Sequence, residues 1–302
     1  MKIIKRLTII SILTLSFLSV PPLLAQTVVE IEPLFEYPVA PEELPDMYEK
    51  SNYLIEHFWD QMNFKSKSAV DQNALNHAFK VYSVAMRFAD KDKTLRENQK
   101  LINNLSKNPT LLFQFTKAAE ENLYGPRAEV WIDEVYMQFL KSIVGNKKIP
   151  SNKRNYYEKQ LKAITASANG YVAPTFSFED REGKNKNYFP MSTLTIIIFG
   201  NPWDTDWRLA RLQLESDINL ISALDKGKIN FLFILPEERE GWKTQVEKYS
   251  DKWVVGTSKE VKDIYDIRVI PSIYVIGADG KIITKNVSLA EGLQTLMQQI
   301  NE

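Results

Sequence analysis

Apolar side chains recur at steps of three and four residues between Asp46 and Ala168, the spacing that places them on one face of a helix. Asn108-Pro109 and Gly125-Pro126 interrupt this pattern, because proline and glycine end helices. The pattern predicts an all-helical domain over residues 41–168. Its helices are expected near residues 47–62, 75–88, 95–105, 110–126, 129–144 and 151–168.

The pattern changes after Asn169-Gly170, where short continuous apolar runs replace the helical spacing. Thr193–Phe199 (TLTIIIF) and Ile229–Leu235 (INFLFIL) are typical of strands buried on both faces of a parallel sheet. Ala278-Asp279-Gly280 is typical of a hairpin connection. Strands alternating with helices, followed by a hairpin, predict an α/β fold with a mixed sheet over residues 169–302. Strands are predicted at 175–179, 193–199, 229–235, 272–276 and 281–285, and helices at 205–222, 241–249, 261–265 and 289–300.

The first 25 residues have a basic start, a short apolar core and a proline stop. The apolar run Leu7–Val20 ends at Pro21-Pro22 and is shorter than the ~20 residues of a membrane-spanning helix. Residues 1–25 are therefore predicted to be a cleaved secretory signal peptide, with an uncleaved membrane anchor as the alternative. After cleavage the chain is expected to be exported, to lack a transmembrane segment and to begin with an irregular, proline-punctuated segment over residues 26–40.

Composition excludes several classes of function. Loss of three basic residues with the leader would leave 35 of the 38 basic residues against 38 acidic ones, a net charge of about −3. Nucleic acid is not expected as a partner, because a basic surplus is missing. The chain contains no cysteine, and its two histidines, His57 and His77, are expected to be core or boundary residues of the helical half. No metal site and no cofactor are predicted.

The segment after the strand Thr193–Phe199 reads FGNPWDTDWRLAR. The tight turn between a strand and the start of a helix is a common place for a reactive group in α/β proteins. Here this turn contains two aspartates. Asp204 or Asp206 is predicted to be the N-cap of the helix, which would stabilise the fold by about 1 kcal/mol relative to alanine. Ligand binding or proton transfer is the alternative, although no histidine or second carboxylate cluster is known to converge on them.

Two tryptophans share this turn with the aspartates. Trp203 stands within the turn and Trp207 in the first turn of the predicted helix. We expect both to pack against the loop at Ile270-Pro271, with a partner-facing aromatic patch as the alternative.

Three segments of the second half resemble the thioredoxin-like fold in its peroxiredoxin and TlpA-like branch. They are GYVAPTFSFEDREGK at the start of the predicted sheet, TIIIFGNPWDTDWR at the turn and VIPSIYVIGADGKII at the hairpin. The branch has the pattern F-x-x-P-x-C-x-x-C at the turn, and alignment on Pro202 puts Asp204 and Trp207 at the two cysteine positions. The resemblance also implies a cis peptide bond before Pro271, in a loop that presents backbone groups to an extended peptide.

Asp204 and Trp207 cannot replace the sulfur chemistry of those cysteines. A cysteine at a helix N-terminus is favoured as the thiolate, and attack on a disulfide requires that sulfur. Because the chain has no cysteine elsewhere, dithiol–disulfide and peroxidatic reactions are excluded for this chain acting alone.

The first half also resembles a known type of domain. HFWDQMNF, AAEENLYGP and the AxANG junction are similar to a helical domain of unknown function that precedes thioredoxin-like domains in exported proteins of Bacteroidota-type bacteria. This resemblance covers roughly Pro41–Ala168 and implies nothing firm about activity.

We therefore expect a redox-inactive thioredoxin-like protein of the Gram-negative periplasm or cell envelope, with a non-catalytic binding or scaffolding role and a protein or peptide partner. One alternative is an accessory role in a thiol–disulfide pathway beside a cysteine-bearing partner. The other is an aspartate-based hydrolase at Asp204 and Asp206. The predicted contact site is a groove formed by Pro202, Trp203, Asp204, Asp206, Trp207, Ile270 and Pro271.

Overall fold

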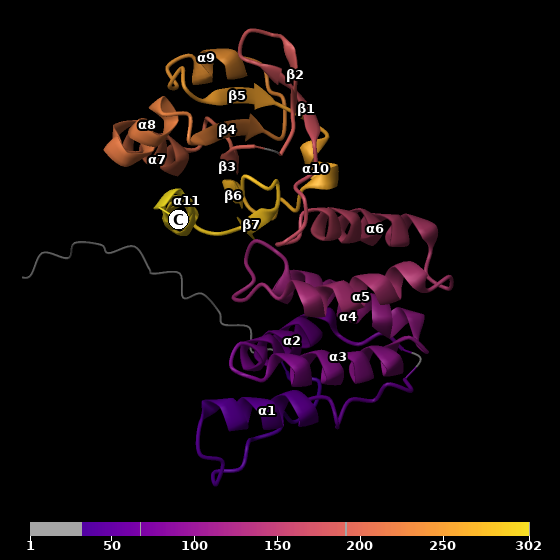
Figure 1. The fold of residues 1–302 in the computed structure, drawn as a ribbon. Helices are drawn as coiled ribbons and strands as arrows, with labels where there is room; N and C mark the ends of the chain where they lie inside the picture. The colour runs from indigo at the N-terminus through magenta and orange to yellow at the C-terminus, as the bar shows by residue number, and fades with distance from the viewer. Residues whose placement is uncertain (1–31, 67, 191, 302) are drawn as a thin grey trace, which may run out of the picture. The chain divides into compact units, whose positions relative to one another are not determined.

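The first half of the chain is helical, as the apolar spacing predicts (Figure 1). The structure is a computed structural model that describes residues 32–66, 68–190 and 192–301, so the predicted signal peptide lies outside the described residues. Aspartate or asparagine side chains cap the first four helices by accepting a backbone N–H, which explains why these helices begin where they do. The helices are α1 (Met47–His57), α2 (Gln72–Met86), α3 (Lys91–Leu105), α4 (Pro109–Leu123), α5 (Asp133–Gly145) and α6 (Ser151–Ala166).

The helices share one hydrophobic cluster, which extends from Ile55 to Ile164 and is rich in buried aromatic rings. Helix α5 begins at Asp133, four residues later than predicted. Before it, the indole of Trp131 donates to the carbonyl of Gly125 at 3.1 Å, which holds this segment as a loop. None of the helices within the described residues is both long and apolar enough to cross a bilayer.

A seven-stranded mixed sheet follows, in the order β2-β1-β5-β4-β3-β6-β7 among the described residues. Strands β3, β4 and β5 are parallel, and the other pairings are antiparallel. This confirms the predicted α/β class with mixed strand directions. The strands are β1 (Phe176–Asp180), β2 (Asn185–Tyr188), β3 (Leu194–Phe199), β4 (Ile229–Leu235), β5 (Val254–Thr257), β6 (Ser272–Ile276) and β7 (Ile282–Lys285).

Alternate residues of β3 enter two different hydrophobic clusters, because successive side chains of a strand point to opposite faces. Ile196 and Ile198 belong to one cluster, which the helices α7 and α11 help to cover. Ile197 and Phe199 belong to the other cluster, together with aromatic residues of β1, β2 and β6. The helices of this half are α7 (Thr205–Ser216), α8 (Ile218–Asp225), α9 (Trp242–Val246), α10 (Val261–Ile264) and α11 (Leu289–Asn301).

In the sheet half, two strands were not predicted and one predicted helix is two helices. Strand β2 reads NKNY, which has no apolar alternation. Pairing with β1 holds this segment as a strand. Strand β5 is only four residues long, below the length at which a pattern is clear. The helix predicted over 205–222 is two helices, because Asp217 is extended and its side chain caps α8 through the backbone N–H groups of Asn219 and Leu220.

A buried cluster of charges joins α5 to the loop before β6. Asp266 is fully buried and accepts from Arg268 at 2.6 Å and from Lys285 at 2.6 Å. Arg268 also contacts Asp133 at the start of α5, and Lys285 lies 3.0 Å from the same carboxylate. The exposed fraction of the Arg268 side chain is 2% and that of Lys285 is 7%, so these charges compensate one another away from water.

Aromatic rings complete the surroundings of the Arg268 guanidinium. The ring centroids of Tyr124 and Trp131 lie 4.6 Å and 5.2 Å from its central carbon. Close by, the hydroxyl of Ser167 accepts the backbone N–H of Asp266 at 3.0 Å. Residues from the helical half therefore hold the segment that leads into Pro271.

We expect the stability contribution of Asp266 to disappear in acid. Burial by itself would raise the pKa of Asp266, but the charges of Arg268 and Lys285 outweigh it and lower the pKa below its usual value. A carboxyl with a lowered pKa in the folded state stabilises the fold above its unfolded pKa of about 4, and that contribution is lost as pH falls through the folded pKa. The free energy of unfolding, measured by urea titration, should therefore differ most between the wild type and Asp266→Asn above pH ~5.

Other carboxylates with lowered pKa values, such as Glu56 and Asp279, titrate in the same acidic range in both proteins and cancel in this difference. The gap between wild type and Asp266→Asn should narrow below pH ~4. A gap that stays constant down to pH ~2 would contradict a charged Asp266 in the folded protein.

Candidate functional site

The turn after β3 and the loop before β6 lie side by side because their strands are paired. The antiparallel register of β3 and β6 puts Phe199 opposite Ser272, so the next residue of each segment, Gly200 and Pro271, meet at the same edge of the sheet. The Ile270-Pro271 peptide bond is cis, as the resemblance implies. Gly200 leaves no room for a side chain, since a Cβ there would lie 2.2 Å from the ring of Phe233.

Asp204 is the N-cap of α7. Its backbone is extended, and its carboxylate accepts the backbone N–H of Trp207 at 2.8 Å. Asn201 organises the preceding turn, because its side chain accepts from Trp203 at 3.2 Å and its carbonyl accepts from Asp204 at 3.1 Å. Asp206 lies exposed in the first turn of the helix. The carboxylate of Asp204 thus satisfies a backbone donor that would otherwise be unpaired.

Trp207 lies in the core, with only 1% of the residue exposed. Its ring stacks on Phe233 of β4, with centroids 4.5 Å apart and planes 12° apart. Its indole N–H donates to the hydroxyl of Tyr249 at 2.9 Å, and burial raises the pKa of that tyrosine. The expected packing against the Pro271 loop gives way to packing on the sheet, because helix α7 turns this side chain inward together with Leu214. Trp207 therefore offers no surface to a partner.

A small hollow of about 70 Å³ lies between the turn and the loop. Trp203 and Ile270 of the predicted groove line it, and the exposed fraction of Ile270 is 43%. The guanidinium of Arg239 lies 5.8 Å from the ring centroid of Trp203 and also lines the hollow. Pro202 is buried and Pro271 is half-buried. The remaining lining residues are Gly200, Asn201, Leu235, Pro236 and Glu237.

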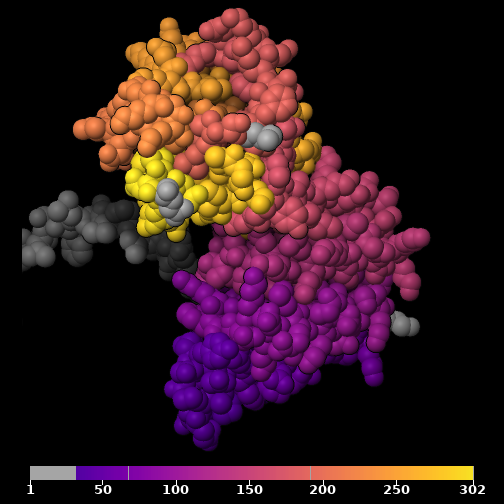
Figure 2. All heavy atoms as spheres, viewed as in Figure 1, coloured from indigo at the N-terminus to yellow at the C-terminus, as the bar shows by residue number. Residues whose placement is uncertain are grey.

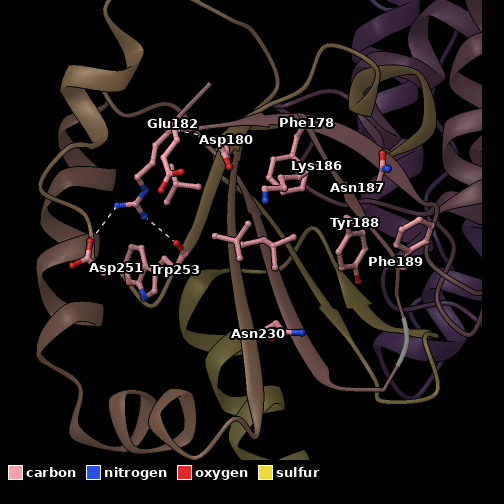
Figure 3. Close-up of a pocket in the computed structure, with 14 residues that line it drawn as sticks. Phe178, Asp180, Glu182, Lys186, Asn187, Tyr188, Phe189, Asn230, Asp251 and Trp253 are labelled. Carbon is pink, nitrogen blue, oxygen red and sulfur yellow. Dashed lines mark hydrogen bonds and ion pairs between the residues drawn. The ribbon is translucent and has the colours of Figure 1, made fainter. Parts of the chain in front are cut away.

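The structure also contains a larger cavity that sequence reasoning missed. It measures about 720 Å³ and lies beside the β1–β2 hairpin (Figure 3). Its lining comes from β1, β2, β4 and the start of β5, four segments that only the folded sheet brings together. No local pattern predicts it, since two of these strands were themselves not predicted.

Metal ligands do not gather at either hollow. Among residues 32–66, 68–190 and 192–301, no group of three or more histidine, aspartate or glutamate side chains could hold a metal ion. His77 bonds to the hydroxyl of Tyr37 at 3.0 Å, and His57 bonds to Asp60 at 2.9 Å. Both histidines belong to the helical half, as residues with ordinary structural partners.

Fold and site together define a class: a thioredoxin-like domain preceded by a helical region. Over residues 16–167, just over half of its length, the chain matches the family described as a domain of unknown function (DUF5106), and it belongs to that family. No curated protein matches it in sequence.

One of the similar solved structures supports the fold, and two more are similar over less than half of this chain. A thioredoxin-like protein from Bacteroides caccae is 17% identical, with a TM-score of 0.70 over 89% of this chain and 99% of that one. A thiol-disulfide oxidoreductase from Bacteroides fragilis is 22% identical over 41% of this chain and 98% of its own, with a TM-score of 0.35. The C-terminal domain of an uncharacterized protein from the same organism is 23% identical over 44% of this chain and 99% of its own, with a TM-score of 0.40.

Proposed function

We propose that this protein is a non-catalytic binding protein, in which the thioredoxin-like domain recognises a protein or peptide without thiol chemistry. The observation that carries this proposal is the role of the two residues that the resemblance aligns with the family's cysteines. Asp204 caps a helix through its carboxylate, and Trp207 is part of the core. Because the chain has no cysteine anywhere, thiol exchange by its own residues is excluded, while the turn and the cis-proline loop are still built.

The binding surface we propose is the hollow between Trp203 and Ile270. Ile270 exposes an apolar side chain, and Trp203 presents an aromatic ring beside the cation of Arg239. Aromatic and arginine side chains are the residue types enriched where proteins bind one another. The edge of the loop before β6 can add backbone hydrogen bonds to an extended peptide.

The place of action that we propose is the cell envelope of a Gram-negative bacterium, following export. The apolar run Leu7–Val20 supports this proposal. The hydrolase alternative is less well supported, because Asp204 is engaged as a cap and Asp206 is exposed. An accessory role in a thiol–disulfide pathway remains compatible with the same surface and depends on what the partner carries.

Site-specific photo-crosslinking tests this proposal. With the photoreactive residue p-benzoylphenylalanine in place of Ile270, we expect a discrete adduct in producing cells that weakens when Trp203→Ala is added. The control position is Ile218 on α8, which is 81% exposed and lies outside the lining of the hollow. Figures 1 and 2 show α8 in orange at the surface of the sheet half.

No adduct from Ile270, or the same adducts from both positions, would contradict the proposed surface. Mass spectrometry of the adduct then separates the two roles. A partner with a reactive cysteine supports the accessory role in thiol–disulfide exchange, and a partner without one supports simple binding.

A further inference from the structure

The cavity beside the β1–β2 hairpin is built as a preformed site. Arg181, in the hairpin turn, donates to the carbonyls of Tyr249, Ser250 and Trp253 at 2.9–3.2 Å and lies 3.8 Å from the carboxylate of Asp251. Dashed lines in Figure 3 mark two of these contacts. They tie the hairpin to the loop before β5, so hydrogen bonds fix two of the segments that line the cavity.

The inner surface of the cavity is largely apolar and aromatic. Leu232 lies deep in it, while Phe189 and Val254 expose 66% and 41% of their surfaces. Phe178 and Tyr188 belong to the hydrophobic cluster on this face of the sheet and line the cavity. Its volume of about 720 Å³ falls within the range of roughly 300–1,000 Å³ that is usual for small-molecule sites.

Three polar groups of this lining form no well-formed hydrogen bond or close ion pair with the described residues. The residue Tyr188 is 6% exposed, and its hydroxyl lies near Thr195 without a well-formed hydrogen bond. Asn230, at the start of β4, is exposed, and its side-chain amide makes no hydrogen bond within the described part of the chain. Figure 3 shows the hydroxyl of Tyr188 directed toward the end of the cavity where Asn230 lies. A buried hydroxyl without a well-formed hydrogen bond destabilises the fold, and a ligand acceptor would supply that bond.

The third group is the ammonium of Lys186, which forms no ion pair within the described residues and points into the cavity in Figure 3. Lys186 and Tyr188 stand two residues apart on β2, so strand alternation puts them on the same face. Asp180 interacts with the Lys186 charge at longer range, and its carboxylate already accepts the backbone N–H groups of Glu182 and Lys184. Glu182 itself is paired with Lys184 at 2.6 Å.

We propose that this cavity binds a small organic anion with an aromatic or otherwise apolar body. The body lies on Leu232, Val254 and the aromatic rings, and the acidic group lies between Lys186 and Tyr188. The site is independent of the Trp203–Ile270 surface, which lies beyond the carboxyl end of β3. Asn230, by contrast, lies near the amino end of the neighbouring parallel strand β4.

A matched pair of fluorescent probes tests the ligand class. Anilinonaphthalene sulfonate carries an aromatic body and one negative charge, and N-phenylnaphthylamine has the same rings without the sulfonate. We expect saturable binding of the sulfonate to the wild type. Lys186→Gln and Tyr188→Phe should each weaken that binding by about threefold to fivefold and leave the neutral probe unaffected.

Two further variants locate the probe and control for general effects. Val254→Trp fills the cavity from a position that is already partly exposed and should weaken both probes by more than about tenfold. Lys226→Gln, at an exposed position after α8 and outside the lining, should leave both affinities unchanged. Circular dichroism confirms that each variant is folded.

Three outcomes would overturn the proposal. They are an absence of saturable sulfonate binding, affinities that Val254→Trp leaves unchanged, and equal losses for the charged and neutral probes in Lys186→Gln. Each outcome also leaves the Trp203–Ile270 surface untouched, so the two proposals fail separately.

Discussion

Replacing Arg268 with methionine should lower the free energy of unfolding by about 3–5 kcal/mol, the cost of removing one partner from a buried ion pair. The guanidinium is 2% exposed and contacts both Asp266 and Asp133. Methionine fills part of the space but leaves Asp266 fully buried with Lys285 as its only remaining cation in the cluster. Urea titration followed by circular dichroism measures the loss.

The control for this variant is an exposed ion pair that also joins the helical half to the sheet half. Lys159 of α6 lies 3.5 Å from Asp263 of α10, and the two side chains are 72% and 64% exposed. Lys159→Met should change stability by no more than about 1 kcal/mol, because water screens exposed pairs. If Arg268→Met costs no more than Lys159→Met, the buried cluster does not hold the halves together.

Replacing Trp207 with alanine should destabilise the protein by about 3–5 kcal/mol, the usual cost of truncating a large buried aromatic side chain. The change removes the stacking on Phe233 and leaves the hydroxyl of Tyr249 without its donor. The thermal midpoint and the urea midpoint should both fall. Trp207→Phe should cost less, because it keeps a ring in the same space.

Trp203→Ala is the matched control, since this tryptophan stands four residues earlier in the same turn and is only half-buried. We expect it to cost about 1 kcal/mol or less and to act on partner binding instead. Equal losses from the two substitutions would contradict the assignment of Trp207 to the core and Trp203 to the surface.

Much of the fold follows from local patterns that the sequence displays. The helical spacing of the first half and the continuous apolar runs of β3 and β4 predict their elements, because each reflects which faces are buried. Strands β2 and β5 were missed for a physical reason: partner strands hold them, and their own residues carry no pattern. The break at Asp217 was not predicted either, because an aspartate within a helical apolar pattern can also be the cap of a second helix.

The candidate site was predictable in part. Alignment on Pro202 placed the turn beside the cis-proline loop, and pairing of β3 with β6 brings these segments together. The inward direction of Trp207 was not predicted, although the seven-residue step to Leu214 carries a helical signal for it. The charged cluster gave no local signal, because Asp133 lies 135 residues from Arg268 along the chain.

The sequence by itself determined that these 302 residues supply no thiol of their own, since the absence of cysteine requires no structure to establish. It also determined that a helical half precedes a mixed-sheet half, because an element that buries one face has apolar residues at regular spacing along the sequence. The helix cap at Asp204 was one of the two caps that the sequence predicted, and the structure confirms it. Only the tertiary structure decided that Trp207 is buried, and that Lys186 and Tyr188 line a cavity with Leu232. These properties depend on which segments, far apart in the sequence, come into contact in the fold. Such contacts produce no regular spacing of residues in a single sequence.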